Sequence, residues 1–362
     1  MLKRLHVNNF TVFSEANFEF GPGLNVIVGT NGAGKSHVLK LGYIAGRVTA
    51  KILGDENLAP GPENWQYYLA QRLKDIFQPE EIGKLVSWPA KKGTASIEVE
   101  FSGNSNNKLF FSFSSTAKQP VIGGKQPITV TQFPKRLGLS WSIFFPPKEV
   151  LTLSWLRNIY KTRVLPIDDV YPSLLDLLAE VPLRDSEISP EISKAINSIK
   201  RIIGGQVEQV GERYYLVSKQ RKTEIELVAE GMRKFAMLER LLRNGILTRE
   251  SLLFWDEPEA NLNPALLKKM AAVLTELAKQ KFQIILATHS LFLLNELHIL
   301  AQTQQTPVRY FGLYQTKTGE TKVEQTDDLE TLNHLVALDE EIAQTTRFQR
   351  VLDNEDAHAE HN

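Results

Sequence analysis

Eight residues near the start of the chain have the types and spacing of a phosphate-binding loop. They read Gly29, Thr30, Asn31, Gly32, Ala33, Gly34, Lys35 and Ser36, which matches the pattern G-x-x-x-x-G-K-S. Glycines let successive backbone N–H groups converge on phosphate oxygens. Lys35 can reach the β- and γ-phosphates, and the Ser36 hydroxyl can ligate Mg²⁺. The alternative is a glycine turn without a ligand.

The residues on both sides of this loop predict the elements that such a site requires. The run from Leu24 to Val28 has the character of a buried strand. Apolar residues then recur at helical spacing, at Val38, Leu41, Ile44 and Val48. The helix that begins near Gly34 would direct its positive end at the bound anion.

An acidic pair follows a second predicted strand, Leu252 to Trp255. Ligands of open α/β sheets bind at the carboxyl ends of the strands. Asp256 would hold Mg²⁺, directly or through water, and Glu257 would polarise the water that attacks the γ-phosphate. The alternative is a strand followed by an acidic turn. Asn263 and Pro264 then have the character of an N-cap and a first helical residue.

A third predicted strand, 282–287, ends beside His289. A histidine at the carboxyl edge of a sheet can hydrogen-bond a γ-phosphate or the attacking water. A lone histidine is more often structural, but the position after the acidic strand favours a catalytic role.

The composition limits the classes of protein that fit. The chain has 362 residues, 42% of them hydrophobic, which allows one large core or two modest ones. Lys and Arg number 42, as do Asp and Glu, so no global positive charge indicates nucleic-acid binding. The absence of cysteine excludes disulfides, thiolate zinc sites and cysteine nucleophiles. No secretory or transmembrane segment is apparent, which predicts a cytoplasmic protein without membrane contact.

The pattern along the chain predicts an α/β fold with three parts and a tail. Residues 1–150 contain the phosphate loop, an antiparallel β region and a hairpin over 95–113. Residues 151–205 are mainly helical and broken by prolines, which predicts a helical lobe. Residues 206–350 alternate strands and helices, as in a doubly wound domain. Residues 351–362 form a polar tail expected to be disordered.

Together the phosphate loop, the acidic pair and His289 resemble the ABC-type ATPase superfamily, in that family's order. Within it they resemble the branch of SMC, RecF-like and OLD-type ATPases. The nearest likeness is to the standalone ATPases of bacterial anti-phage systems such as Septu and PARIS. The resemblance implies an ABC-type head with an inserted helical lobe, which uses ATP and Mg²⁺ and hydrolyses ATP to ADP and phosphate.

In this superfamily two heads enclose ATP, and a signature loop from one head completes the site of the other. The matching place here is Val228 to Lys234, where Gly231 fits the signature glycine and Arg233 and Lys234 could bind phosphate. Ala229 and Glu230 replace the usual serine and glycine. The alternative is a packed helix over 231–243. The candidates for the family's switch loop are Gln132 and the segment 145–149, which contains two prolines. Phe10 or Phe13 could stack on the adenine base, although each of these two residues also fits a hydrophobic core.

The leading functional expectation is a Mg²⁺-dependent ATPase switch that forms a homodimer or higher oligomer. It would control a separately encoded effector, such as a nuclease or toxin, in anti-phage defence. The alternatives are a RecF-like DNA-repair ATPase, a transporter subunit and a slow ATP-bound scaffold, and nucleic acid stays a possible ligand. Only 73 residues follow His289, and Thr326 fits the N-cap of a helix over 327–330, so no nuclease domain is expected.

Overall fold

The computed structural model describes residues 1–87, 93–103, 106–163, 165–316, 319–333, 344 and 346–348. The predicted tail, 351–362, lies outside these residues.

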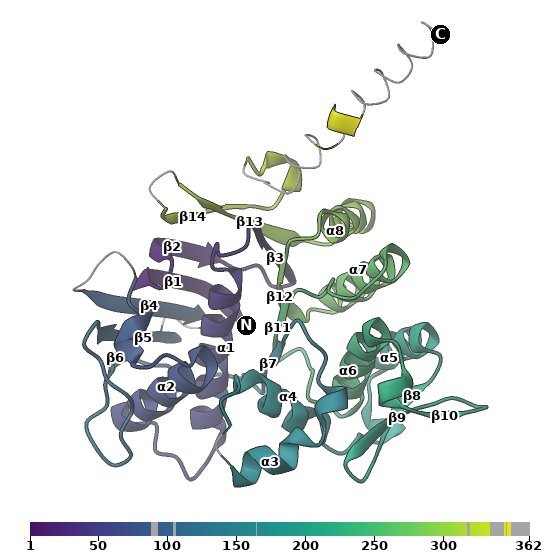
Figure 1. Ribbon diagram of the computed structural model, residues 1–362, viewed down its shortest axis with the longest axis horizontal. Coiled ribbons are helices and arrows are strands. Elements are labelled where there is room, and N and C mark those ends of the chain that lie inside the picture. The colour runs from purple at the N-terminus through teal and green to yellow at the C-terminus, as the bar shows by residue number, and fades with distance from the viewer. Residues whose placement is uncertain are drawn as a thin grey trace, which may run out of the picture.

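A six-stranded sheet forms the centre of the molecule (Figure 1). Its order is β14-β13-β3-β12-β11-β7. The neighbours from β13 to β7 pair in parallel, and β14 is antiparallel to β13. The strands are β3 (Leu24–Gly29), β7 (Ser142–Phe145), β11 (Leu252–Asp256), β12 (Gln283–Thr288), β13 (Val308–Gln315) and β14 (Thr321–Thr326). The predicted α/β class is confirmed.

Helices cover both faces of this sheet, which explains why its central strands are almost entirely buried and mostly apolar. α1 (Lys35–Gly54) packs on one face, and α7 (Pro264–Lys279) and α8 (Leu291–Gln304) lie on the other (Figure 1). Alternate strand residues enter different cores: Val26 belongs to the α7 side and Ile27 to the α1 side. The predicted cap of α7 is confirmed, because the Asn263 side chain accepts a hydrogen bond from the Leu266 N–H.

The N-terminal antiparallel sheet packs against the other side of α1, with the order β2-β1-β4-β5-β6. Its strands are β1 (Leu2–Phe10), β2 (Phe13–Glu19), β4 (Thr94–Phe101), β5 (Lys108–Ser114) and β6 (Thr129–Gln132), and α2 (Pro62–Phe77) covers it. The predicted hairpin is β4–β5. Phe10 and Phe13, the candidates for base stacking, are fully buried and belong to the hydrophobic core. Gln132 is exposed at the end of an edge strand, which does not favour it as the switch residue.

The predicted helical lobe contains α3 (Leu156–Thr162), α4 (Val170–Leu178) and α5 (Pro190–Ile203). A three-stranded sheet, β8 (Gln206–Val210), β9 (Arg213–Val217) and β10 (Lys222–Glu224), follows it and leads into α6 (Glu230–Arg243). Short 3₁₀ turns are η1 (Ile82–Leu85), η2 (Leu151–Leu153), η3 (Asp185–Glu187), η4 (Ile225–Leu227) and η5 (Leu329–Thr331). The cap of η5 is Asp328 rather than the predicted Thr326. The central sheet takes strands from both sides of the boundary predicted at residue 150, and the three-part division stays a prediction.

Within the described residues, we find no helix with the length and apolar character needed to cross a bilayer.

Candidate nucleotide site

The register of the central sheet brings the predicted site residues to one edge. Val28 pairs with Thr288, and Ala287 pairs with Asp256. The three strands are parallel, so the phosphate loop, His289 and the acidic pair all follow neighbouring carboxyl ends. Segments separated by more than 200 residues of sequence therefore share one site.

Two glycines of the loop are required by close packing. Gly34 precedes α1 with φ of +94°, and a Cβ there would lie 2.6 Å from the ring of Phe13. A Cβ on Gly29 would lie 2.4 Å from the carbonyl oxygen of Leu313. At Gly32 a Cβ would have no neighbour within 4 Å, so this side of the loop is open. The loop has the backbone geometry of an anion cradle with an open side for its ligand.

Lys35 and Ser36 connect the loop to the acidic strand. The Lys35 ammonium donates to the carbonyls of Gly29 and Thr30, at 2.7 and 3.1 Å. Burial lowers the pKa of Lys35, and the carboxylates at positions 256, 257 and 259 oppose that shift. A cation held among carboxylates in a loop of N–H donors is suited to a polyphosphate.

Asp256 is buried, and the Ser36 side chain lies near it. Burial raises the pKa of Asp256, while the neighbouring Ser36 hydroxyl lowers it. A hydroxyl and a carboxylate near one another, both hard oxygen ligands, form a donor set that fits Mg²⁺. The two residues that were predicted to hold the metal are thus brought together.

Glu257 and His289 lie side by side at the edge. Glu257 has φ of +48°, a conformation that is costly for a residue with a side chain and that concentrates at functional sites. Its side chain is 33% exposed, and its Oε1 lies 3.6 Å from His289 Nδ1. The pair can therefore act on a water molecule at the open face of the site.

Glu259 is a residue that the sequence analysis missed. It is buried, and its Oε1 accepts hydrogen bonds from the Thr288 hydroxyl at 2.7 Å and from the His289 N–H at 2.9 Å. The same oxygen lies 3.3 Å from His289 Nδ1. The sequence feature that could have identified Glu259 as a site residue was its position two residues after the acidic pair. Glu259 positions the histidine.

We expect Glu259→Gln to lower kcat about tenfold with the KM for ATP unchanged, because the amide keeps an acceptor but loses the charge beside the imidazole. Glu259→Ala should also lower the free energy of unfolding by about 1–3 kcal/mol, because Thr288 loses its acceptor. Steady-state kinetics and urea unfolding of both variants check this. A purely structural role would instead leave kcat of the glutamine variant intact.

The signature-like segment packs against the loop that follows the acidic pair. A Cβ on Gly231 would lie 2.6 Å from Leu262 and 2.9 Å from the Asn261 carbonyl oxygen, so the glycine permits close contact inside the chain. The Asn261 amide donates to Glu230 at 2.8 Å. The carboxylate that replaces the usual signature glycine is thus paired. The contact of Gly231 with a nucleotide on another head stays a prediction.

The two basic residues of this segment bind within the chain. Arg233 donates to Glu149 at 2.8 Å and to the carbonyls of Val228 and Glu226. Lys234, which was also expected to offer a donor to phosphate, is fully buried and donates to the Glu257 carbonyl at 3.0 Å. Burial lowers the pKa of Lys234 to about 8. Arg233 would have to release these partners to reach a phosphate, and its predicted role stays untested.

The proline-containing segment after β7 lies beside the site. Phe145 pairs with Trp255, the residue before Asp256, and their rings are 4.7 Å apart. The segment ends at the buried Glu149, the partner of Arg233. Of the two candidates for the switch loop, this one has the contacts that could transmit movement between the site and α6.

The chain is similar to known proteins in sequence and in fold. The family model described as "AAA domain, putative AbiEii toxin, Type IV TA system" matches residues 135–295. The DNA replication and repair protein RecF of Shewanella piezotolerans is 25% identical over 224 residues, 58% of each chain. The chain thus spans less than two thirds of that relative.

Solved structures of SMC heads are similar in fold. The SMC head bound to the C-terminal winged-helix domain of ScpA has a TM-score of 0.51 and 13% identity, over 91% of this chain and 98% of that one. The SMC head domain of Thermotoga maritima has a TM-score of 0.46 and 15% identity, over 90% and 98%. The comparison with the ScpA-bound head supports the fold of an SMC head.

Proposed function

We propose that this chain, whose fold and motifs are those of an ABC-type ATPase of the SMC and RecF kind, binds Mg²⁺-ATP and hydrolyses it as a conformational switch. The observation that carries this proposal is the register of the central sheet, which brings the phosphate loop and the acidic strand to the same edge. Bound Mg²⁺ would neutralise charge on the phosphates.

The chain's own residues have separable roles in this reaction. The loop 29–36 and Lys35 bind the phosphates, and Glu257 accepts a proton from the attacking water. His289, held by Glu259, orients that water or the γ-phosphate. Asp256 and Ser36 hold the metal.

We further propose that two copies enclose the nucleotides. Large apolar side chains are exposed next to the elements that would meet: Leu227, 69% exposed, precedes the signature-like segment, and Phe292, 42% exposed, follows His289. Exposed apolar residues at a functional edge favour a face that another protein surface covers.

The switch would act on a separately encoded effector, such as a nuclease or toxin, in anti-phage defence. The resemblance to the ATPases of Septu and PARIS supports this role, whereas the family description applies the name of a putative toxin to the matched domain itself. The lobe and the three-stranded sheet after it offer exposed apolar side chains for such a partner, at Trp155 and Val181 in the lobe and at Val210 in β8. The RecF match favours a second candidate, an ATPase that acts on DNA.

Light scattering and ATPase assays of the full chain test the proposal. We expect hydrolysis that EDTA abolishes, and a monomer that dimerises with ATP. A nuclease or toxin encoded by a neighbouring gene should copurify with it. DNA binding that weakens steeply with salt would favour the second candidate. A chain that neither binds nor hydrolyses ATP would refute both.

A further inference from the structure

A cavity of about 420 Å³ lies at the amino edge of the central sheet, the edge opposite the nucleotide site. Its walls are the last two turns of α1, the start of β7 and one residue of α2. Because a helix rises about 1.5 Å per residue, the α1 wall, which begins at Arg47, is roughly 17 Å or more from Ser36. The volume is within the range of small-molecule sites, about 300–1,000 Å³. None of the nucleotide-site residues lines this cavity.

One face of α1 provides the floor of the cavity. The lining residues of this helix occupy positions i, i+3, i+4 and i+7 and so lie on one side of it; they are Arg47, Ala50, Lys51 and Gly54. Ala50 has a small side chain, and a Cβ on Gly54 would have no neighbour within 4 Å. The two small residues therefore leave open space beside the two cations.

Aromatic rings hold these two cations in place. The Arg47 guanidinium lies 5.9 Å from the centre of the Tyr43 ring, and the Lys51 ammonium lies 5.1 Å from the centre of the Tyr68 ring. A cation–π contact of this kind does not require the N–H groups to donate to an acceptor atom. Lys51 is exposed, and no nitrogen of the half-buried Arg47 is enclosed without a partner. Both cations are therefore accessible to a ligand in the cavity.

The charges that line the cavity do not cancel. Arg72, the lining residue of α2, is paired with Asp169, which lies outside the cavity. Asp55 is the one carboxylate among the lining residues, and its Oδ1 accepts a hydrogen bond from a backbone N–H at 3.1 Å. Arg47 and Lys51 form no ion pair with any of the described residues. One positive charge is thus in excess, which favours an anionic ligand.

Trp141 adds an exposed aromatic wall. It is 38% exposed, although it is a large apolar residue, and it lines the cavity. Its carbonyl accepts a hydrogen bond from the Leu252 N–H at 2.8 Å, and the N–H of the preceding Ser140 donates to the Glu250 carbonyl at 3.1 Å. The backbone that carries the indole is therefore fixed. A partly exposed indole in a cavity with two accessible cations offers a stacking face for a flat ring.

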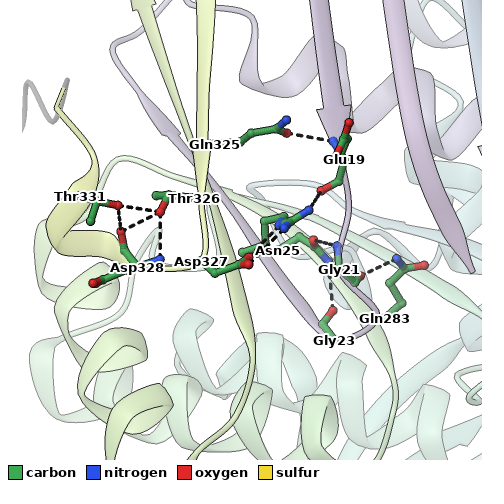
Figure 2. Close-up of polar contacts among 11 residues, drawn as sticks. Glu19, Gly21, Gly23, Asn25, Gln283, Gln325, Thr326, Asp327, Asp328 and Thr331 are labelled. Carbon is green, nitrogen blue, oxygen red and sulfur yellow. Dashed lines mark hydrogen bonds and ion pairs between the residues drawn. The ribbon is translucent and has the colours of Figure 1, made fainter.

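Further hydrogen bonds fix the same edge of the sheet. At the start of β3, the buried Asn25 side chain donates to the carbonyls of Gly21 and Gly23 (Figure 2). At the start of β12, the Gln283 side chain donates to the same Gly21 carbonyl at 2.8 Å. Together with the bond between β11 and Trp141, these contacts hold the edge in place before a ligand arrives, as in most ligand sites.

We propose that this cavity binds a small aromatic anion, a flat ring that carries a phosphate or a carboxylate. The ring would stack on Trp141, and the oxyanion would accept hydrogen bonds from Arg47 and Lys51. Charge-assisted hydrogen bonds and stacking together select a ligand that has both features. This site does not depend on the proposed ATPase function.

Titration calorimetry of the full chain tests the proposal with thymidine 5′-monophosphate, which carries a phosphate, and with phenylacetate, which carries a carboxylate. We expect saturable binding of at least one of them, and the tighter one identifies the oxyanion. The compounds without a charge, thymidine and phenylacetamide, should bind at least about tenfold more weakly than their anionic counterparts. The compounds without an aromatic ring, ribose 5-phosphate and acetate, should bind at least about fivefold more weakly.

Two variants remove the two kinds of contact separately. Trp141→Leu should weaken binding of the anion at least about fivefold, because it removes the stacking face. The double variant Arg47→Gln, Lys51→Gln should weaken it at least about tenfold, because it removes both charged donors. Trp155→Leu and Lys269→Gln change other exposed residues of the same types and should bind like the unmodified protein.

Lys35→Ala distinguishes this site from the phosphate loop. We expect this variant to bind the anion like the unmodified protein, whatever happens to its binding of ATP. Loss of binding in Lys35→Ala would place the anion at the loop and would overturn the proposal. No saturable binding of either anion, equal binding of the uncharged compounds, or undiminished binding to Trp141→Leu or to the double variant would also overturn it.

Discussion

Glu257→Gln should lower ATP turnover at least about 100-fold and leave ATP binding intact. A positioned general base contributes roughly 10²–10⁴-fold to a rate, and the amide cannot accept the proton of the attacking water. Its shape preserves the φ of +48° and the backbone bond from the Glu257 N–H to the Ala287 carbonyl. Single-turnover hydrolysis and equilibrium binding of ATP measure the two effects separately.

The same variant should accumulate the dimer. If ATP closes two heads and hydrolysis releases them, blocked hydrolysis shifts the population toward the closed form. Light scattering with Mg²⁺-ATP measures that population. Glu250→Gln is the matched control, because Glu250 is exposed before β11, at the strand's other end. Unchanged turnover in Glu257→Gln would contradict the assignment of the base.

The elements around the site could be predicted because local patterns specify them. The strand before Gly29, the strand before Asp256 and the cap at Asn263 each depend on residues close in sequence, and the structure has all three. The convergence of the loop and the acidic pair followed from a general property of parallel sheets. Local sequence patterns and the topology of the sheet were thus sufficient to predict which segments meet at this edge of the sheet.

The contacts of polar side chains across the fold could not be predicted in this way. Arg233 was expected to face a phosphate, yet its partner is Glu149, 84 residues earlier in the chain. Lys234 belongs to a helix whose neighbours determine that it is buried. Such pairings depend on tertiary packing, which sequence spacing does not encode.

Lys35→Ala is expected to weaken Mg²⁺-ATP binding by roughly 10–100-fold, because a hydrogen bond to a charged group contributes about 1.5–3 kcal/mol. The alanine also leaves the Gly29 and Thr30 carbonyls without the ammonium that bridges them, so the loop loses part of its preorganisation. Titration with a fluorescent ATP analogue measures the affinity.

Two further variants separate charge from geometry at this position. Lys35→Arg keeps the charge but replaces a compact ammonium with a planar fork, and we expect it to recover little of the lost affinity. Lys269→Ala, which changes an exposed lysine of α7, should bind ATP normally. Full ATP affinity in Lys35→Arg would mean that a positive charge at this position suffices, whatever its geometry. Normal ATP binding in Lys35→Ala would mean that the triphosphate does not bind at the loop 29–36.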